Sequence, residues 1–176
     1  MVTGSSLRQE TPFSRHLSRR LFGRKCLGLT LSALGLAGCV SIPKSRYPAH
    51  DVSAEALEGI NAFRAENGLQ PLKIDAGLIE LAKDQAGLMA AKQILSHDVE
   101  GDFESRMNKG GYRKQAGAEN VGAGHADVAD TLASWQRSPG HRANLLMPEA
   151  IRFGMAKADA PEARFRNYWA LILAGK

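Results

Sequence analysis

The stretch that most constrains the fold of this chain lies at residues 135–146 and reads W-Q-R-S-P-G-H-R-A-N-L-L. Apolar residues recur at helical spacing up to its first residue, at Val128, Leu132 and Trp135. Asp127 stands just before them, where an aspartate commonly caps a helix by accepting a hydrogen bond from a backbone N–H. An amphipathic helix is therefore predicted to lead into this stretch.

A corner is predicted directly after that helix. Pro139 disfavours helical geometry at the residue before it, so the helix should end at Ser138. Gly140 is expected to supply the φ values that a sharp reversal needs. His141 should then open a second short helix, where unpaired N–H groups and the positive end of the dipole disfavour a charged imidazole. The stretch predicts a neutral His141 at a fixed corner.

Several motifs occur in a fixed order along the rest of the chain. They are N-A-F-R-A-E-N-G-L-Q-P-L at 61–72, L-S-H at 95–97, A-E-N-V-G-A-G at 118–124, S-P-G-H-R-A-N-L-L at 138–146 and Y-W-A-L-I-L-A at 168–174. Together they resemble a bacterial member of the CAP superfamily, which comprises cysteine-rich secretory proteins, antigen 5 and plant pathogenesis-related proteins. The resemblance implies a three-layer α-β-α sandwich with a small antiparallel sheet. Helices before and between strands indicate, by themselves, only an α+β fold.

Periodicity and capping residues predict the remaining elements. A first helix, with Leu57, Ile60 and Phe63 on its apolar face, is expected to end at Gly68. A longer helix capped by Asp75 should reach Ser96-His97-Asp98, and a short one is expected over 102–109 before a glycine pair. Strands are expected at 118–124, at 151–156 and at 169–173. Alternating apolar residues predict that the second strand is half-buried, whereas the continuous apolar run predicts that the third is central.

The N-terminal segment, residues 1–38, has the pattern of a bacterial export signal. Basic residues precede an apolar run, C-L-G-L-T-L-S-A-L-G-L-A-G, that is shorter than the roughly 20 apolar residues a bilayer span needs. Arg19 and Arg20 resemble the twin-arginine signature, which implies export of a folded protein; a general secretory signal is the alternative. The sequence L-A-G-C, ending at Cys39, resembles a lipobox, so Cys39 is expected to carry lipid and anchor the chain to the membrane.

These features predict three parts: an export signal at 1–38, a proline-containing tether at 39–50 and a CAP-like domain at 51–176. The expected location is the bacterial cell envelope, with the domain facing the periplasm or the exterior. A soluble secreted protein, cut near Cys39 without lipidation, is the alternative. Cys26 lies in the signal and Cys39 is assigned to lipid attachment, so no disulfide is expected in the domain.

The charge balance changes once the signal is set apart. The chain has 23 Lys and Arg and 18 Asp and Glu residues, but six of the bases and only one of the acids lie in residues 1–38. Residues 39–176 therefore hold 17 of each sign and are formally neutral. The basic character belongs to the signal, which argues against nucleic-acid binding.

The resemblance implies a cleft lined by two histidines and one or two acids. His97, Glu119 and His141 stand at the matching positions, while Ser138 takes the place of the second acid of many eukaryotic relatives. Two imidazoles and a carboxylate are also the ligand types of an open zinc site. The alternative is that Glu119 only accepts hydrogen bonds in a semi-buried pocket. Ser138, His141 and Glu119 also match the residue types of a serine hydrolase, although the chain lacks a G-x-S-x-G elbow.

Three polar residues near these positions are assigned structural roles. His125, in a glycine-flanked turn, is predicted to face solvent, and Asn120 and Asn144 to bond local backbone. His97 is expected at the C-terminal end of a helix, where the dipole favours the charged form, so it should keep its proton to higher pH than His141.

Three functions are consistent with these residues. The first is a non-enzymatic envelope module that binds a lipid, a small amphiphile or a cell-wall component in the histidine cleft. The second is a hydrolase of peptides or wall polymers that uses a divalent metal such as zinc on His97, Glu119 and His141. The third is a structural or adhesion domain with a vestigial cleft. The missing second acid favours the first.

Overall fold

The computed structural model describes residues 47–176, and the predictions for Arg19, Arg20, Cys26 and Cys39 lie outside these residues. In the described part, one sheet contains the strands β1 (Ala49–Asp51), β2 (Lys73–Ile74), β3 (Gly117–Ala123), β4 (Arg152–Asp159) and β5 (Asn167–Ala174). The strand order is β1-β4-β5-β3, and every pair along it is antiparallel. The two-residue β2 adds a parallel pair with β4. The predicted small antiparallel sheet is confirmed, apart from β2.

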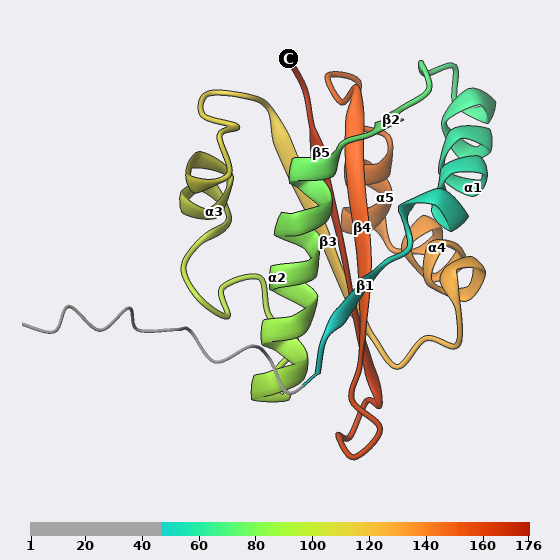
Figure 1. Ribbon diagram of the computed structural model, residues 1–176. Coiled ribbons are helices and arrows are strands. Elements are labelled where there is room, and N and C mark those ends of the chain that lie inside the picture. The colour runs from blue at the N-terminus through green and yellow to red at the C-terminus, as the bar shows by residue number, and fades with distance from the viewer. Residues whose placement is uncertain (1–46) are drawn as a thin grey trace, which may run out of the picture. The chain divides into compact units, whose positions relative to one another are not determined.

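Helices cover both faces of this sheet. They are α1 (Ser53–Glu66), α2 (Ala76–Lys92), α3 (Phe103–Lys109), α4 (Val128–Arg137) and α5 (Pro139–Leu145). Figure 1 shows α2 and α3 on one side of the strands and α1, α4 and α5 on the other. Two clusters of buried apolar residues correspond to the two faces: one joins α2 and α3 to the sheet, and the other joins α1, α4 and α5 to it. The three-layer α-β-α sandwich is therefore confirmed.

Aspartate caps begin three of the helices, and those at Asp75 and Asp127 were predicted. The side chains of Asp75, Asp102 and Asp127 each accept a hydrogen bond from a backbone N–H in the first turn of the helix that follows. Gly68 follows α1 with φ +73°, a left-handed conformation that favours glycine. Local capping chemistry thus reproduces these helix ends.

Strand β4 differs from the prediction because helices cover both of its faces. Phe153 and Met155 are fully buried in the cluster with α1 and α4, and Ala156 is fully buried in the cluster with α2. At Gly154 a Cβ atom would lie 2.2 Å from the backbone nitrogen of Ile79 in α2. Helix α2 therefore lies directly on the backbone of β4, and the residues expected to face solvent face this helix.

Two boundaries also differ from the prediction. Helix α2 ends at Lys92, where Gln93 adopts the left-handed conformation with φ 56°, so His97 lies in a loop and not at a helix end. Strand β1 contains Ala49 and the exposed His50, which the sequence analysis assigned to the tether. Within residues 47–176, none of the helices has the length and apolar character that a bilayer span requires.

Candidate functional site

The candidate site forms around the free edge of β3. Among the described residues, this strand ends the sheet order and pairs with β5 alone. Successive side chains of a strand point to opposite faces, so Glu119 shares a face with Val121 of the α2 cluster, and Asn120 shares a face with Ala118 of the α1 cluster. The loop after α2 and the helix α5 approach this edge from the two faces, and each brings one histidine.

Glu119 is the centre of the first half of the site. Its carboxylate accepts two hydrogen bonds from Arg106 of α3, at 2.8 Å from one guanidinium nitrogen to Oε2 and 3.0 Å from the other to Oε1. Oε1 also lies 2.8 Å from Nδ1 of His97. The side chains of Glu119 and Arg106 are 2% and 9% exposed, whereas that of His97 is 52% exposed. A buried ion pair thus holds one exposed imidazole.

The network fixes the orientation of His97. A carboxylate can only accept, so Nδ1 carries the hydrogen and donates it to Glu119, which leaves Nε2 as the acceptor of the neutral ring. Arg106 also donates to the His97 carbonyl at 2.9 Å, and the Gln85 amide does so at 3.3 Å. These contacts fix the loop that carries His97, which is not held at the end of a helix.

Arg106 was missed as a site residue by the sequence analysis. It lies three residues after Phe103 and directly before Met107, the two large apolar residues of this helix. A basic residue on the inward face of a short helix needs a buried partner. That position was the signal that could have identified it.

The second half of the site is built on α5. Ser138 is extended, with φ −86° and ψ 119°, so the corner predicted before Pro139 is present. Gly140 lies inside α5 and is absent from the positive-φ residues, which makes its predicted role in a reversal wrong. The change of direction comes from Ser138 and Pro139, and α5 begins two residues before His141.

Side-chain amides connect α5 to the edge strand. Asn120 donates to the His141 carbonyl at 3.1 Å, and Asn144 donates to the Glu119 carbonyl at 3.0 Å and to the Asn120 side chain at 2.9 Å. The predicted bonds to local backbone are therefore wrong, since these partners are distant in sequence. The amides satisfy a main-chain acceptor of the edge strand and hold His141 beside it.

Arg64 of α1 fixes the other end of α5. It is fully buried, and its guanidinium donates to the carbonyls of Leu145 at 2.8 Å, Met147 at 3.1 Å and Ala150 at 3.3 Å. A cation at a helix C-terminus interacts favourably with the negative end of the dipole. Burial lowers the pKa of Arg64 from its ordinary value. This contact determines where α5 stops.

The imidazole of His141 is half-buried against an indole. Its ring centroid lies 6.1 Å from that of Trp135, at an interplanar angle of 47°. Burial lowers the pKa of His141, and positive charge on His97 and His125 lowers it further. The pKa of His141 is thus lowered in the predicted direction, but the causes are burial and the neighbouring imidazoles.

His125 does not face solvent as predicted. Its side chain is only 20% exposed, and Nδ1 lies 3.6 Å from Oδ2 of Asp130. A Cβ atom at Gly122 would lie 3.1 Å from the His125 ring and 3.3 Å from the indole nitrogen of Trp135. The glycine therefore allows both rings to lie against β3, and a third histidine belongs to the site.

Ser138 lies near His141 in sequence but does not form a catalytic pair with it. Its side chain caps neither adjoining helix, and within residues 47–176 its hydroxyl makes no hydrogen bond to an imidazole. A serine nucleophile needs a base within hydrogen-bond reach. This geometry gives no support to the serine-hydrolase alternative.

The same residues do not fit a zinc site. In the described part of the chain, no group of three or more His, Cys, Asp or Glu side chains could hold a metal ion. Both oxygens of Glu119 accept hydrogen bonds from Arg106, whose positive charge opposes a nearby cation. The arrangement offers hydrogen-bonding imidazoles at a surface, above a carboxylate that is buried and already paired.

Comparison with known proteins places this chain in a family. Residues 57–173 match CAP, the cysteine-rich secretory protein family. The protein YkwD of Bacillus subtilis is 28% identical over 108 residues, which cover 60% of this chain and 42% of that protein. The chain thus spans less than half the length of this relative.

Solved structures show the same fold. A Staphylococcus aureus cysteine-rich secretory protein matches with TM-score 0.54 and 28% identity, over 70% of this chain and 38% of that one. An extracellular SCP-domain protein of Bacillus anthracis matches with TM-score 0.61 and 24% identity, over 70% and 40% of the two chains. An outer surface protein of Borrelia burgdorferi matches with TM-score 0.63 and 18% identity, over 73% and 98%. With its three-layer fold and the match over residues 57–173, the chain belongs to the CAP family of cysteine-rich secretory proteins.

Proposed function

We propose that this protein is a non-enzymatic envelope lipoprotein whose CAP domain binds a small amphiphile, a lipid or a cell-wall component at the β3 edge. The pairing of Glu119 with Arg106 carries the proposal. A general base or a metal ligand needs an accessible carboxylate, whereas this one is 2% exposed and paired within the protein. The accessible polar group is His97, whose Nε2 can bond a ligand.

An amphiphile fits the surroundings of His97 best. Ile94 and Leu95 lie in the same loop and are 52% and 45% exposed, although large apolar side chains are usually buried. An apolar ligand segment on these side chains would lose its contact with water, and a polar group could meet the imidazole. This combination supports a lipid or a similar amphiphile over a purely polar ligand.

The proposed location rests on the sequence and on the names of similar proteins. One is called extracellular and another an outer surface protein. Together with the lipobox-like L-A-G-C at Cys39, they support an extracytoplasmic protein anchored by lipid. Mass spectrometry of the protein from its native membrane should find lipid on an N-terminal Cys39. An unmodified Cys39 would remove the anchor from the proposal.

Calorimetry tests ligand binding. The full chain with Cys39→Ser is titrated with a lysophospholipid, a fatty acid and soluble wall fragments. At least one should bind with a micromolar dissociation constant, about −8 kcal/mol. His97→Ala should weaken that binding at least tenfold, and so should the double variant Ile94→Ser, Leu95→Ser.

His50→Ala is the matched control, because His50 is exposed on β1, the opposite edge of the sheet. It should bind like the parent chain. Absence of binding to all three probes, or equal losses in His50→Ala and His97→Ala, would contradict the proposal.

A further inference from the structure

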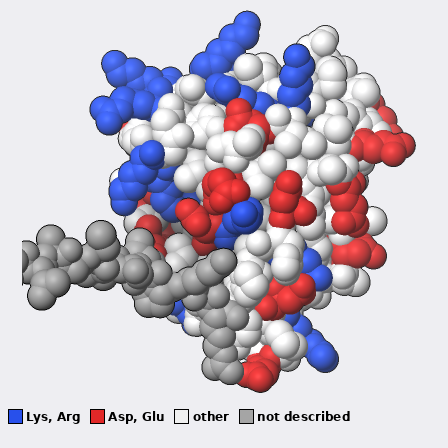
Figure 2. Space-filling view, in the orientation of Figure 1, with Lys and Arg blue, Asp and Glu red and all other residues white. Residues whose placement is uncertain are grey.

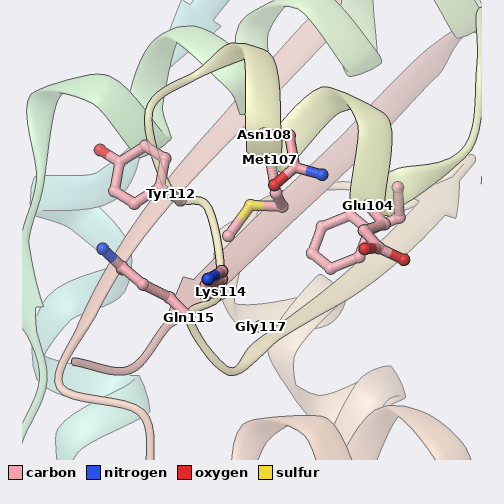
Figure 3. A pocket seen from close by; sticks show the side chains of 8 residues that line it. Glu104, Met107, Asn108, Tyr112, Lys114, Gln115 and Gly117 are labelled. Carbon is pink, nitrogen blue, oxygen red and sulfur yellow. The ribbon is translucent and has the colours of Figure 1, made fainter.

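Two hollows lie at the end of the sheet where β4 begins and β5 ends. One hollow, of about 230 Å³, opens between α3 and the segment before β3. Figure 3 shows Tyr112 and Gln115 on one side of it and Glu104 on the other. A second hollow, of about 490 Å³, is lined by Pro71, Lys73, Ile74, Asp75, Ile151 and Arg152. No histidine of the β3 edge lines either hollow.

Arg152 connects the two hollows. It lines the second, while its guanidinium donates to the Gln115 side chain of the first at 2.9 Å and lies 5.4 Å from the ring centroid of Tyr112. The same guanidinium is 3.4 Å from the carboxylate of Asp75, which also accepts a hydrogen bond from Tyr112. The two hollows therefore lie on either side of the Arg152 side chain, and we call them together the track.

This end of the molecule has more cations than acids, although Glu104 lines the first hollow and Asp75 the second. Exposed cations come to it from β2, from the segment between α3 and β3, and from the residue after Gly175: Lys73, Lys109, Arg113, Lys114 and Lys176. The backbone joins these segments, because Gly175 donates to the Ala116 carbonyl at 2.7 Å. Figure 2 shows Lys and Arg gathered along the upper edge and Asp and Glu along the right-hand side. The described residues 47–176 hold 15 Lys and Arg and 17 Asp and Glu, so the cations gathered at this end contrast with a slightly acidic remainder.

Apolar side chains accompany these cations. Ile74 is 39% exposed and Ile151 is 36% exposed, and both line the second hollow. Cations beside apolar surface recognise a ligand that has both anionic groups and C–H-rich faces. An acidic glycan has both, since each sugar ring has such a face and its carboxylates recur along the chain. We propose that this track binds an acidic glycan chain, through electrostatic attraction and through contact with Ile74 and Ile151.

The register of the sheet places the first described residues far from the basic track. Ala49 pairs with Ala158 near the end of β4, whereas Lys73 pairs with Arg152 at its start. At about 3.3 Å per residue these ends are roughly 20 Å apart. The described chain therefore enters the domain at the end opposite the basic track.

Binding measurements on the full chain with Cys39→Ser test the inference. Polygalacturonate is the probe, with poly-L-glutamate and phosphatidylglycerol vesicles as the other arms. Polygalacturonate should bind more tightly than either, with an affinity that falls as salt rises. The double variant Lys73→Glu, Lys114→Glu should weaken binding at least tenfold. Lys109→Glu with Arg113→Glu provides a second variant of the same surface if the first does not fold.

The matched control is Arg137→Glu with Arg164→Glu, which makes the same change in charge on α4 and in the loop between β4 and β5. It should alter the affinity less than twofold. No binding of polygalacturonate, or equal losses in the two double reversals, would overturn the inference. If poly-L-glutamate binds equally well, the surface recognises charge alone and the inference is overturned. If the vesicles bind more tightly, the surface is a membrane-binding surface and the inference is overturned as well. His97→Ala should leave glycan binding unchanged, so failure here is distinguishable from failure of the amphiphile site.

Discussion

Two buried arginines hold the two halves of the site, and they do so by different chemistry. Arg106 meets a carboxylate, so the charges of Arg106 and Glu119 balance each other beside His97. Arg64 meets only carbonyl oxygens, at the end of the helix that carries His141. The position of one histidine thus depends on an ion pair, and that of the other on hydrogen bonds to backbone. The two imidazoles should therefore respond differently to mutation.

Removal of Arg106 should have the largest effect. Arg106→Ala leaves the Glu119 carboxylate buried without its cation, and breaking a buried pair in this way typically costs about 3–5 kcal/mol. Urea unfolding followed by circular dichroism measures the loss. Adding Glu119→Gln to Arg106→Ala should recover part of it, because the buried charge is then gone. If the double variant is no more stable than Arg106→Ala, unpaired charge is not the cause.

Removal of Arg64 should have the next largest effect. Arg64→Met keeps much of the apolar stem but leaves several carbonyls without their donor, which we expect to cost about 2–4 kcal/mol. The two arginine substitutions should also affect different histidines. In NMR spectra Arg64→Met should shift the His141 ring resonances more than those of His97, and Arg106→Ala should do the reverse. Equal shifts in both variants would contradict the division into two halves.

The pH dependence of stability should show a smaller effect that belongs to His141. Its pKa is lower in the folded protein than the ordinary 6.5. As pH falls through that value the unfolded chain takes up the proton first, so the free energy of unfolding should decrease. The decrease should end once pH has passed the folded pKa, and above the ordinary value the group should have no effect. His141→Gln should remove this part of the slope between pH 8 and pH 5, and an unchanged slope would refute the assignment.

Ser138 should have the smallest effect. Its hydroxyl has no hydrogen bond within the described residues, so Ser138→Ala should change the free energy of unfolding by less than about 0.5 kcal/mol. Ligand binding should also be unchanged. Loss of a measurable ester- or peptide-hydrolysing activity in Ser138→Ala would revive the serine-hydrolase alternative.

Local signals predicted much of the fold. Three aspartate caps, the glycine after α1 and the continuous apolar run of β5 act through nearest neighbours in the chain, so the sequence displays them directly. The burial of β4 could not be read this way. Gly154 and Ala156 break an apolar run as solvent-facing residues would, yet small residues also allow a helix to lie close on a strand. Only the arrangement of the layers separates the two cases.

Sequence reasoning named three residues of the candidate site, but it missed Arg106 and the contacts that connect them. His97, Glu119 and His141 were named from motifs, whereas their roles follow from contacts between distant segments. Arginine is usually a surface residue, and only the spacing of Arg106 from Phe103 indicates that it faces inward. His125 looked like a loop residue because the glycines around it indicate a turn, but one of them, Gly122, makes room for its ring.

The attachment of the chain at β1 has a mechanical consequence. A force applied to the residues before Ala49 acts first on a three-residue strand that pairs only with β4. The imidazoles lie beside β3, at the opposite edge, with β4 and β5 in between. Peeling β1 away would break few hydrogen bonds and leave the β3–β5 ladder paired. A force on the residues before β1 can therefore displace this strand while the geometry around the histidines stays unchanged.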